Sequence, residues 1–394
     1  MESNRRDFIK KSTSISAAIS FAGLGACTGT DSQENRTAGN NLTQWPVLES
    51  TDTPKLCMYC PYNAEERVMR RIKQIGVDYV LMGGPGVPWT EDSLRSIIDR
   101  FKANGLTIIN MMIYVAPNII YGWEGRDTII QQVQDSIRAA GLAGLPVVEY
   151  NFYAHRLIEG YYRLPGRGGV DYLAYDYNRT GTLSDNLNWW YPEARKDSEI
   201  NMAPQDLPPL PEIGIHSSDQ LWDNITFFLK AVIPVAEKAG VRMALHPNDP
   251  PVPVSRGSQQ IMTTFSDWKR LVNIVDSPSN GMTYDCGVSN EIGEDPLEVL
   301  DYFASRDRLN HVHYRNCIVE TPGIKYVEVF PDNGSVNMFE VMRQLVQRKY
   351  KLGLYAEHPR VLDYDKEHPE KGDYAGWVYN IAYARAMMQA VMSS

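Results

Sequence analysis

Three of the seven histidines stand where short apolar runs of the sequence end. His246 opens "HPNDPPVPV", His313 lies in "HVHYRN", and His358 lies in "YAEHPR". Two carboxylates, Asp285 in "TYDCG" and Glu357, occupy similar positions. Leaving such groups buried and unpaired would cost several kcal/mol each, whereas one divalent cation would satisfy them together. The pattern therefore indicates a metal site, in which the prolines after His246 would hold one ligand rigidly.

Strand periodicity selects the ligands among these residues, because successive side chains of a strand point to opposite faces. Asp285 faces one way and Cys286 the other. The predicted metal ligands are His246, Asp285, His313 and Glu357. Two imidazoles and two carboxylates suit Mn²⁺ best and also allow Zn²⁺ or Fe²⁺. His358 directly follows the last ligand, and we predict that it transfers protons during catalysis.

Other polar groups near the same run ends could hold a substrate. Arg315 and Arg360 flank the predicted metal site and could bind a substrate carboxylate in a forked geometry. Asn151, in "EYNF", and Asn316, in "HVHYRN", are further predicted substrate contacts. A substrate that carries a carboxylate is therefore what these residues lead us to expect.

Eight apolar runs alternate with amphipathic stretches, and this order predicts how the site residues are brought together. The runs are Leu56–Tyr62, Val77–Met82, Thr107–Val115, Pro146–Tyr153, Val241–His246, Gly281–Cys286, Asn310–Arg315 and Gly353–His358. Eight strands that alternate with eight helices predict an α/β protein of the (β/α)₈ TIM-barrel class, rather than an open doubly wound sheet. In such a barrel, the carboxyl ends of all the strands meet at one rim, where active sites form.

One connection in this pattern is much longer than the others. Residues 156–217 separate the fourth strand from its helix and contain "YYRLPGRGGVDYLAYDYNR" and "NWWYPEAR". Connections of this length are usually functional or disordered. Their Tyr, Trp, Arg and Gly residues suit a lid that stacks on sugar rings and binds anionic groups. Packing against the barrel rim is the alternative, and both interpretations stay open.

The N-terminal segment predicts export. "NRRDFIKK" is a twin-arginine signature, and the quartet that ends at Cys27 resembles a bacterial lipobox. The apolar stretch between them is too short and too rich in serine for a stable transmembrane helix. We predict a signal peptide over residues 1–26, lipidation of Cys27, a flexible tether over 27–53 and a catalytic barrel over 54–394. The protein would be periplasmic or on the cell surface, in contact with a membrane only through its lipid anchor.

Composition excludes some functions and leaves others open. The formal net charge is -9 at pH 7, and no run of basic residues lies beyond the N-terminus, so nucleic acid is not an expected partner. An acidic protein can still bind an anionic substrate, because a local arginine or a metal dominates a pocket. Cys57 and Cys60 form a lone C-x-x-C whose members would face opposite ways, which favours packing over redox or metal binding. The sequence does not indicate an oligomeric state.

Several of these motifs together resemble a known family. "MALHPNDPPVPV", "SPSNGMTYDCG", "HVHYRN" and "AEHPR" are similar, in order and spacing, to motifs of the mannonate dehydratases, and "EYNF" and "MYCPYN" fit them too. The resemblance covers most of residues 55–390, apart from the insertion. It implies a metal-dependent TIM barrel of the xylose-isomerase-like group. Such an enzyme removes water from a six-carbon sugar acid to give a 2-keto-3-deoxy acid, typically with Mn²⁺.

The resemblance also implies residue roles, and here the sequence departs from the family pattern. The family's histidine ligands fall on His246 and His313, and its catalytic histidine falls on His358. Its cysteine ligand falls on Asp285, its aspartate ligand on Glu357, and a second histidine on Arg360. The family's catalytic tyrosine falls on Trp377, a predicted substrate contact. Tyr374 is the nearest phenol, and we predict it as the second catalytic residue.

These departures, with the predicted export, suggest a changed substrate. We expect a metal-dependent hydro-lyase that removes water from a uronic acid, or from a uronate-containing oligosaccharide derived from an acidic polysaccharide. Three alternatives stay open. They are a D-mannonate dehydratase proper, a sugar isomerase or epimerase that uses the same metal centre, and a saccharide-binding lipoprotein without catalysis.

Overall fold

The computed structural model describes residues 47, 49–157, 159–180 and 202–394. The predicted signal peptide, its lipidation site at Cys27 and most of the predicted tether lie outside these residues, as does "NWWYPEAR" in the insertion. Export, lipidation and the role of that segment therefore remain predictions. Within the described residues, no helix is both long enough and apolar enough to cross a membrane.

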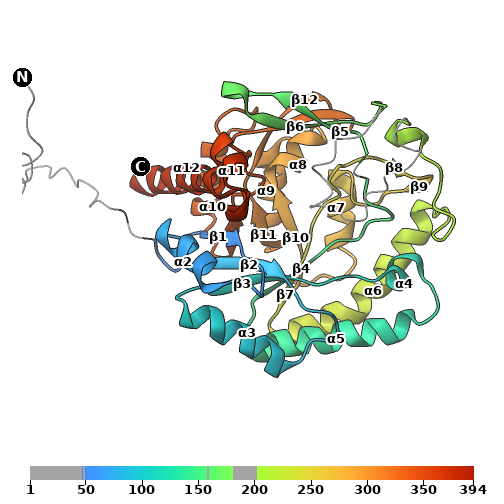
Figure 1. Ribbon diagram of the computed structural model, residues 1–394. Helices are drawn as coiled ribbons and strands as arrows, with labels where there is room; N and C mark the ends of the chain where they lie inside the picture. Colours follow the sequence, from blue (N-terminus) through green and yellow to red (C-terminus); the bar gives the residue numbers. More distant parts are fainter. Residues whose placement is uncertain (1–46, 48, 158, 181–201) are drawn as a thin grey trace, which may run out of the picture. The chain divides into compact units, whose positions relative to one another are not determined.

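Eight parallel strands close into a barrel at the centre of the unit Trp45–Ser394 (Figure 1). Each strand pairs with the next one along the chain that belongs to the barrel, and the last pairs with the first. The barrel strands are β1 (Lys55–Tyr59), β2 (Tyr79–Gly83), β3 (Thr107–Met112), β4 (Val147–Tyr150), β7 (Arg242–Leu245), β10 (Asn280–Asp285), β11 (Leu309–His313) and β14 (Gly353–Tyr355). The predicted TIM-barrel fold is confirmed.

A helix follows each barrel strand, and these helices surround the barrel (Figure 1). They are α2 (Glu66–Gln74), α3 (Glu91–Ala103), α5 (Arg126–Ala143), α6 (Ser218–Ala239), α7 (Phe265–Val272), α9 (Pro296–Ala304), α10 (Met338–Gln347) and α12 (Tyr374–Ser393). Shorter helices α4 (Pro117–Tyr121), α8 (Cys286–Glu291) and α11 (Asp363–Glu367) lie in the connections. Local chemistry sets the helix ends. In α6, for example, Ser217 accepts a hydrogen bond from the backbone of Gln220 at the start, and Gly240 adopts a left-handed conformation at the end.

The inside of the barrel is polar just below its rim. Glu149 on β4 accepts hydrogen bonds from Asn110 on β3 (2.7 Å) and Thr283 on β10 (2.8 Å), and all three side chains are buried. His311 on β11 is buried as well and lies close to Glu149. We call these four residues the barrel floor. In contrast, Tyr150 faces outwards and packs its ring against α6. Because buried polar groups are costly, their presence inside the barrel indicates that the neighbouring rim, at the carboxyl ends of the strands, has a function.

A second sheet, which the sequence did not predict, is formed by two hairpins. Strands β5 (Tyr161–Pro165) and β6 (Asp171–Asp176) come from the long insertion after β4. Strands β12 (Asn316–Thr321) and β13 (Lys325–Val329) follow β11. Together they form an antiparallel sheet in the order β12-β13-β6-β5, which we call the upper sheet (Figure 1). The insertion is placed as predicted, but this part of it is a folded hairpin. A short further hairpin joins β8 (Val254–Ser255) to β9 (Ser258–Gln259).

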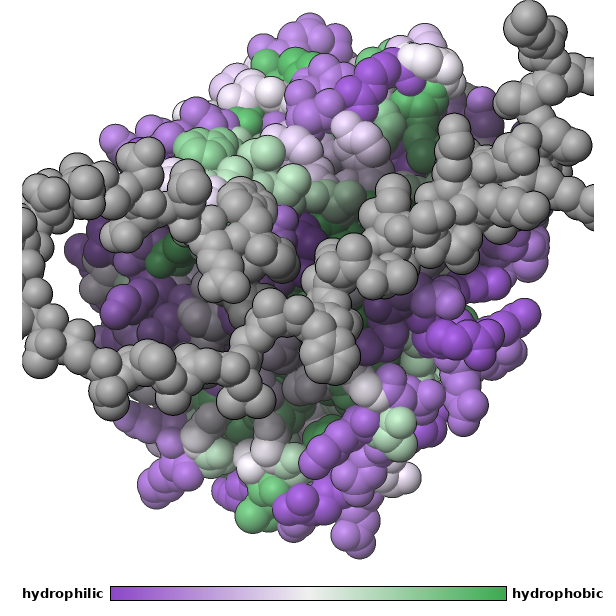
Figure 2. All heavy atoms as spheres, turned by 90° about the vertical axis from the view of Figure 1, so that its left-hand side faces the viewer, coloured by the Kyte–Doolittle hydropathy of each residue, from purple (hydrophilic) through white to green (hydrophobic). Residues whose placement is uncertain are grey.

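Figure 2 shows the face on the left-hand side of Figure 1, and outside the grey atoms it is mostly hydrophilic, with hydrophobic residues in small groups. Such a mixed surface is ordinary for a face in contact with water. The two cysteines of the C-x-x-C motif are both buried. Burial raises the pKa of the Cys60 thiol to about 12, which makes it a poor nucleophile or metal ligand. Packing is therefore the role that the structure supports for this motif.

Candidate metal centre and active site

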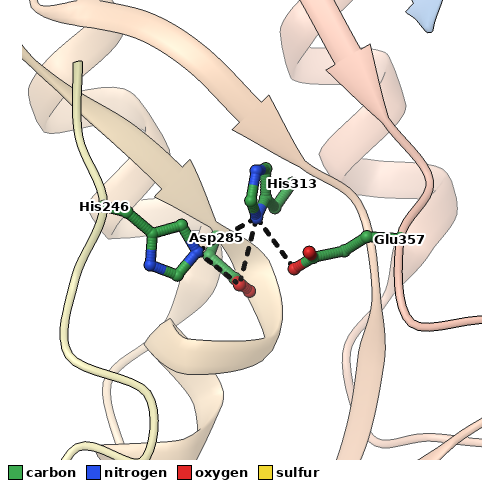
Figure 3. Close-up of side chains that lie close together, drawn as sticks. All are labelled: His246, Asp285, His313 and Glu357. Atoms are coloured by element: carbon green, nitrogen blue, oxygen red, sulfur yellow. Dashed lines mark hydrogen bonds and ion pairs between the residues drawn. The ribbon is translucent and has the colours of Figure 1, made fainter. Parts of the chain in front are cut away.

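The four predicted metal ligands converge at the carboxyl ends of neighbouring barrel strands (Figure 3). His246 follows β7, Asp285 ends β10, His313 ends β11, and Glu357 follows β14. Each offers one nitrogen or oxygen atom, and these four atoms all lie within 4.8 Å of one another. All four side chains are buried. A single cation of moderate size fits between these atoms.

Two features show that this arrangement suits a cation. Nε2 of His246 and Nδ1 of His313 are 3.1 Å apart, about the separation of two nitrogens that each lie about 2.0–2.2 Å from one shared ion. Oε1 of Glu357 lies 2.8 Å from the same Nδ1 of His313, yet among the described residues it accepts no hydrogen bond of normal geometry. This unsatisfied oxygen and the three other ligand atoms lie together in a buried position and form the donor set that a divalent ion would need.

Neighbouring groups affect the two histidines differently. Nδ1 of His246 donates to the backbone carbonyl of Pro247 at 2.7 Å, which leaves Nε2 free to face the site. Burial lowers the pKa of His246, and so does the nearby His313. On the far side of His313, Nε2 lies 3.5 Å from Oε1 of Glu149 in the barrel floor. The hydrogen bond to Pro247 therefore orients the imidazole of His246 as in metal-bound histidines, whereas Nε2 of His313 only lies near a carboxylate.

Asp285 has two separate tasks. Its Oδ1 accepts a hydrogen bond from the backbone of Val288 and caps helix α8, while its Oδ2 faces His246 and His313 at 3.8 Å. Cys286 points away from the site, as the strand periodicity predicts, and its buried thiol donates to the backbone carbonyl of Arg315. Asp285, and not the adjacent cysteine, is thus the residue of β10 that is placed to hold a metal ion.

His358 lies beside the metal centre and is held by a carboxylate that the sequence analysis missed. Its Nδ1 donates to Oε2 of Glu328, on β13, at 2.7 Å, and its Nε2 lies 3.5 Å from Oε2 of the ligand Glu357. His358 has a left-handed backbone (φ 48°), a conformation that costs free energy and is common at functional sites. Burial lowers the pKa of His358, but Glu328 and Glu357 together raise it to about 9. Glu328 was missed because it lies on a hairpin that was not predicted.

These groups open into one cavity of about 410 Å³ between the barrel rim and the upper sheet. Its lining includes ligand residues, the barrel floor residue Glu149, and side chains of the upper sheet. The lining includes Asn151, Tyr161, Arg163, Asp171, Leu173, His246, Asp249, His313, Glu328, Glu357, His358, Arg360 and Asp373. This volume is typical of a site for one small molecule, within the usual range of roughly 300–1,000 Å³.

Known proteins are similar to this chain in sequence and in fold. The sequence model of the D-mannonate dehydratase (UxuA) family matches residues 58–394. The chain is 30% identical, over 283 residues, to a mannonate dehydratase of Streptococcus pneumoniae (strain 70585), which covers 70% of this chain and 75% of that protein. The chain belongs to the D-mannonate dehydratase family. It is accordingly an enzyme of the hydro-lyase class, in a family that depends on a metal ion.

Solved structures agree with this assignment. The crystal structure of mannonate dehydratase from Streptococcus suis serotype 2 matches with a TM-score of 0.70 and 26% identity, over 86% of this chain and 95% of that one. D-Psicose 3-epimerase from Clostridium cellulolyticum H10 matches with a TM-score of 0.51 and 12% identity, over 85% of this chain and 99% of that one. At that identity the second match shows the fold alone, which is the xylose-isomerase-like TIM barrel expected from the motifs.

Two predicted substrate residues of this dehydratase line the cavity. Asn151 does so with a buried Oδ1 that has no hydrogen-bond partner among the described residues. Arg360 also lines it, but its guanidinium already donates to Oε2 of Glu328 (2.9 Å) and to the backbone carbonyl of His358 (2.8 Å). Asn151 is thus available to a ligand, whereas Arg360 mainly holds the His358–Glu328 pair in place.

The structure corrects the predicted position of Arg315. Its side chain is buried beneath the metal centre and does not line the cavity. The guanidinium donates hydrogen bonds to Asp285 (2.9 Å), Glu291 (2.7 Å) and Asp249 (3.2 Å), and its Nε also lies 3.2 Å from Oε1 of Glu357. A cation in this position neutralises and orients acidic groups from three different segments, so Arg315 supports the metal ligand and is not placed to meet a substrate carboxylate.

Three more predicted residues lie outside the cavity lining. The amide of Asn316 donates to the backbone carbonyls of Pro331 and Val336 and so fixes a loop. Tyr374 begins α12, and its hydroxyl donates to the backbone carbonyl of Arg71 in α2. Trp377 stacks on Tyr355, which itself lines the cavity, with ring centroids 5.3 Å apart. The sequence could not show where these three side chains point, because each orientation depends on a partner residue that is distant in the chain.

Proposed function

We propose that this enzyme removes water from a six-carbon sugar acid, D-mannonate or a close stereoisomer, and forms a 2-keto-3-deoxy acid. The observation that carries the proposal is the joint position of the four ligands and the His358–Glu328 pair on one cavity of about 410 Å³. Family membership supports a hydro-lyase, and relatives 30% identical are mannonate dehydratases. The cavity volume favours a single sugar unit.

The metal would be held by His246, Asp285, His313 and Glu357, and Mn²⁺ is the ion that we propose. When bound, it would act as a Lewis acid that stabilises the negative charge formed on the carboxylate side of the substrate. The reaction removes a proton from the carbon beside the carboxylate and hydroxide from the next carbon. The enol that remains rearranges to the ketone, so that one water leaves for each substrate molecule.

His358 is suited to the proton transfer of this reaction. Its Nδ1–H is committed to Glu328, so only Nε2 can exchange a proton with a ligand in the cavity. The carboxylate of Glu328 stabilises the imidazolium, and we propose that His358 protonates the leaving hydroxyl. Tyr161, from the insertion, brings a phenol to the cavity, where its hydroxyl donates to Asp249 at 3.2 Å. We propose Tyr161 in place of Tyr374 as the second proton carrier.

One observation favours a second substrate class. The motif departures at Arg360 and Trp377, together with the β5–β6 hairpin in the cavity wall, differ from the pattern expected for mannonate itself. A uronic acid, free or at the end of an oligosaccharide, is the candidate that fits these departures. Export through the predicted signal peptide, and anchoring at Cys27, would place the enzyme where such sugars occur.

The test uses the full chain, stripped with a chelator and reloaded with Mn²⁺. D-Mannonate, its stereoisomers, free uronates and uronate oligosaccharides are each incubated, and the product mass is followed. The proposal expects loss of one water and a new 2-keto group with a hexonate, only in the reloaded protein. Loss of water only with uronates would establish the second class. A product of unchanged mass would show isomerisation, and no product with any acid would overturn the proposed function.

A further inference from the structure

A second group of side chains that could hold a metal ion lies inside the barrel, below the rim ligands. Glu149 on β4 and His311 and His313 on β11 each offer one atom, and these three atoms all lie within 4.8 Å of one another. All three side chains are buried. We call these three residues the floor site. The proposed chemistry assigns no task to Glu149 or His311.

His313 belongs to both groups through its two ring nitrogens. Its Nδ1 faces the other rim ligands, at 3.1 Å from Nε2 of His246 and 2.8 Å from Oε1 of Glu357 (Figure 3). Its Nε2, on the opposite side of the ring, lies 3.5 Å from Oε1 of Glu149. One imidazole therefore separates the rim site from the floor site.

The nitrogen atoms of the floor site have no hydrogen-bond partner in the part of the chain that the structure describes. This holds for both ring nitrogens of His311 and for Nε2 of His313, all of them buried. The oxygens of Glu149 already accept hydrogen bonds from Asn110 (2.7 Å) and Thr283 (2.8 Å). Buried polar groups are normally paired. Unpaired nitrogens that lie together beside a carboxylate are therefore suited to bind an ion or a water molecule.

The strands around His311 are shaped for an imidazole. His311 is paired with Thr283 on β10, whose hydroxyl donates to Glu149, so that both side chains point into the barrel. On the other side, β14 has Gly353, and a Cβ atom there would lie only 2.9 Å from Cε1 of His311. Any larger residue would thus displace the ring. An apolar side chain in place of His311 would avoid the cost of burying polar atoms, so the imidazole indicates a binding role.

We propose that Glu149, His311 and His313 bind a second divalent cation, Zn²⁺, inside the barrel. Two histidines and one carboxylate are a known protein ligand set for zinc. Zn²⁺ binds more tightly than Mn²⁺ to such a nitrogen-rich site, whereas Mn²⁺ prefers oxygen ligands and would remain at the rim. The inference concerns metal binding alone and does not depend on the proposed substrate.

Zinc at the floor site would hold His313 from behind. The 3.5 Å contact with Glu149 is too long to do so by a hydrogen bond. With both sites filled, each ring nitrogen of His313 binds one ion, and the proton on Nε2 passes to solvent as zinc binds. Metal–nitrogen distances of about 2.0–2.1 Å on both sides of the ring would place the two ions roughly 6 Å apart.

The experiment measures the metal content of the full chain, stripped with a chelator and then dialysed against Mn²⁺ alone or Zn²⁺ alone. By elemental analysis we expect about one Mn²⁺ per chain, but about two Zn²⁺. In Glu149→Gln and in His311→Gln, zinc should fall to about one ion per chain, while Mn²⁺ stays at about one because the rim is intact. His216→Ala is the matched control, since it removes a histidine away from the cavity and should leave both values unchanged.

Anomalous diffraction at the zinc edge, from crystals of the Zn²⁺-loaded chain, locates the ions. We expect a peak about 2.0–2.2 Å from Nε2 of His313 and from a carboxylate oxygen of Glu149. A single zinc per chain, a second zinc on surface residues, or a water molecule between the two histidines would overturn the inference. Unchanged zinc content in both floor-site variants would do the same. The proposed function is judged separately, by the mass of the product.

Discussion

The barrel rim and the upper sheet contribute to the cavity in different ways. The rim brings together the four predicted metal ligands at the ends of β7, β10, β11 and β14, and short-range strand geometry sets their positions. The upper sheet is built from two hairpins that are about 150 residues apart in the chain, and it supplies Glu328, Arg163 and Asp171. We therefore propose that the rim provides the metal site, whereas the upper sheet positions His358 and contributes to the choice of substrate.

The largest effect is expected at the rim. His313→Ala removes a ligand whose Nδ1 lies 3.1 Å from Nε2 of His246 and 2.8 Å from Oε1 of Glu357. We expect loss of stoichiometric metal, measured by elemental analysis, and activity near background. His216→Ala is the control, because His216 contacts the backbone of Ile213 away from the cavity and should leave metal content unchanged. Full metal content and turnover in His313→Ala would contradict the assignment.

His358→Gln should separate proton transfer from metal binding. A positioned acid or base typically contributes about 10²–10⁴-fold, so kcat should fall by roughly that factor. His358 is not among the four ligands, so metal content should stay near that of the unchanged enzyme. Retention of kcat within a factor of about three would show that another group moves the proton.

Glu328→Gln tests the contribution of the upper sheet to catalysis. The amide keeps the shape but no longer stabilises a charged His358, whose Nδ1 lies 2.7 Å from Oε2 of Glu328. A loss of about 10–100-fold in kcat is expected, with little change in KM. The pH profile should also change, because Glu328 raises the pKa of His358. An unaltered pH profile with normal kcat would show that the upper sheet lines the cavity but does not contribute to catalysis.

The smallest effect is expected at Tyr374. Its hydroxyl donates to the backbone of Arg71 and lies outside the cavity lining. Tyr374→Phe should leave kcat and KM within about twofold, and lower the free energy of unfolding by about 1 kcal/mol, the usual value of one hydrogen bond. Denaturant unfolding and steady-state kinetics measure both. A large drop in kcat would restore Tyr374 as a catalytic residue.

The rim could be predicted from sequence because strand ends converge in a barrel whatever the helices do. His246, Asp285, His313 and Glu357 each end an apolar run, and the alternation of faces separated Asp285 from Cys286. The upper sheet could not be predicted, because β6 meets β13 only through the folded barrel. Arg315 shows the same limit, since its role depends on three carboxylates from other segments. Where a side chain follows the end of a strand, as Arg315 does, its orientation is set by partner residues that are distant in the chain.

The central claim is that one divalent cation is shared by four side chains at the barrel rim. Anomalous diffraction from crystals of the Mn²⁺-loaded protein tests it most directly. We expect one strong peak about 2.0–2.3 Å from Nε2 of His246, Nδ1 of His313, Oδ2 of Asp285 and Oε1 of Glu357. An ion bound elsewhere, or these four groups separated by solvent in the loaded protein, would contradict it.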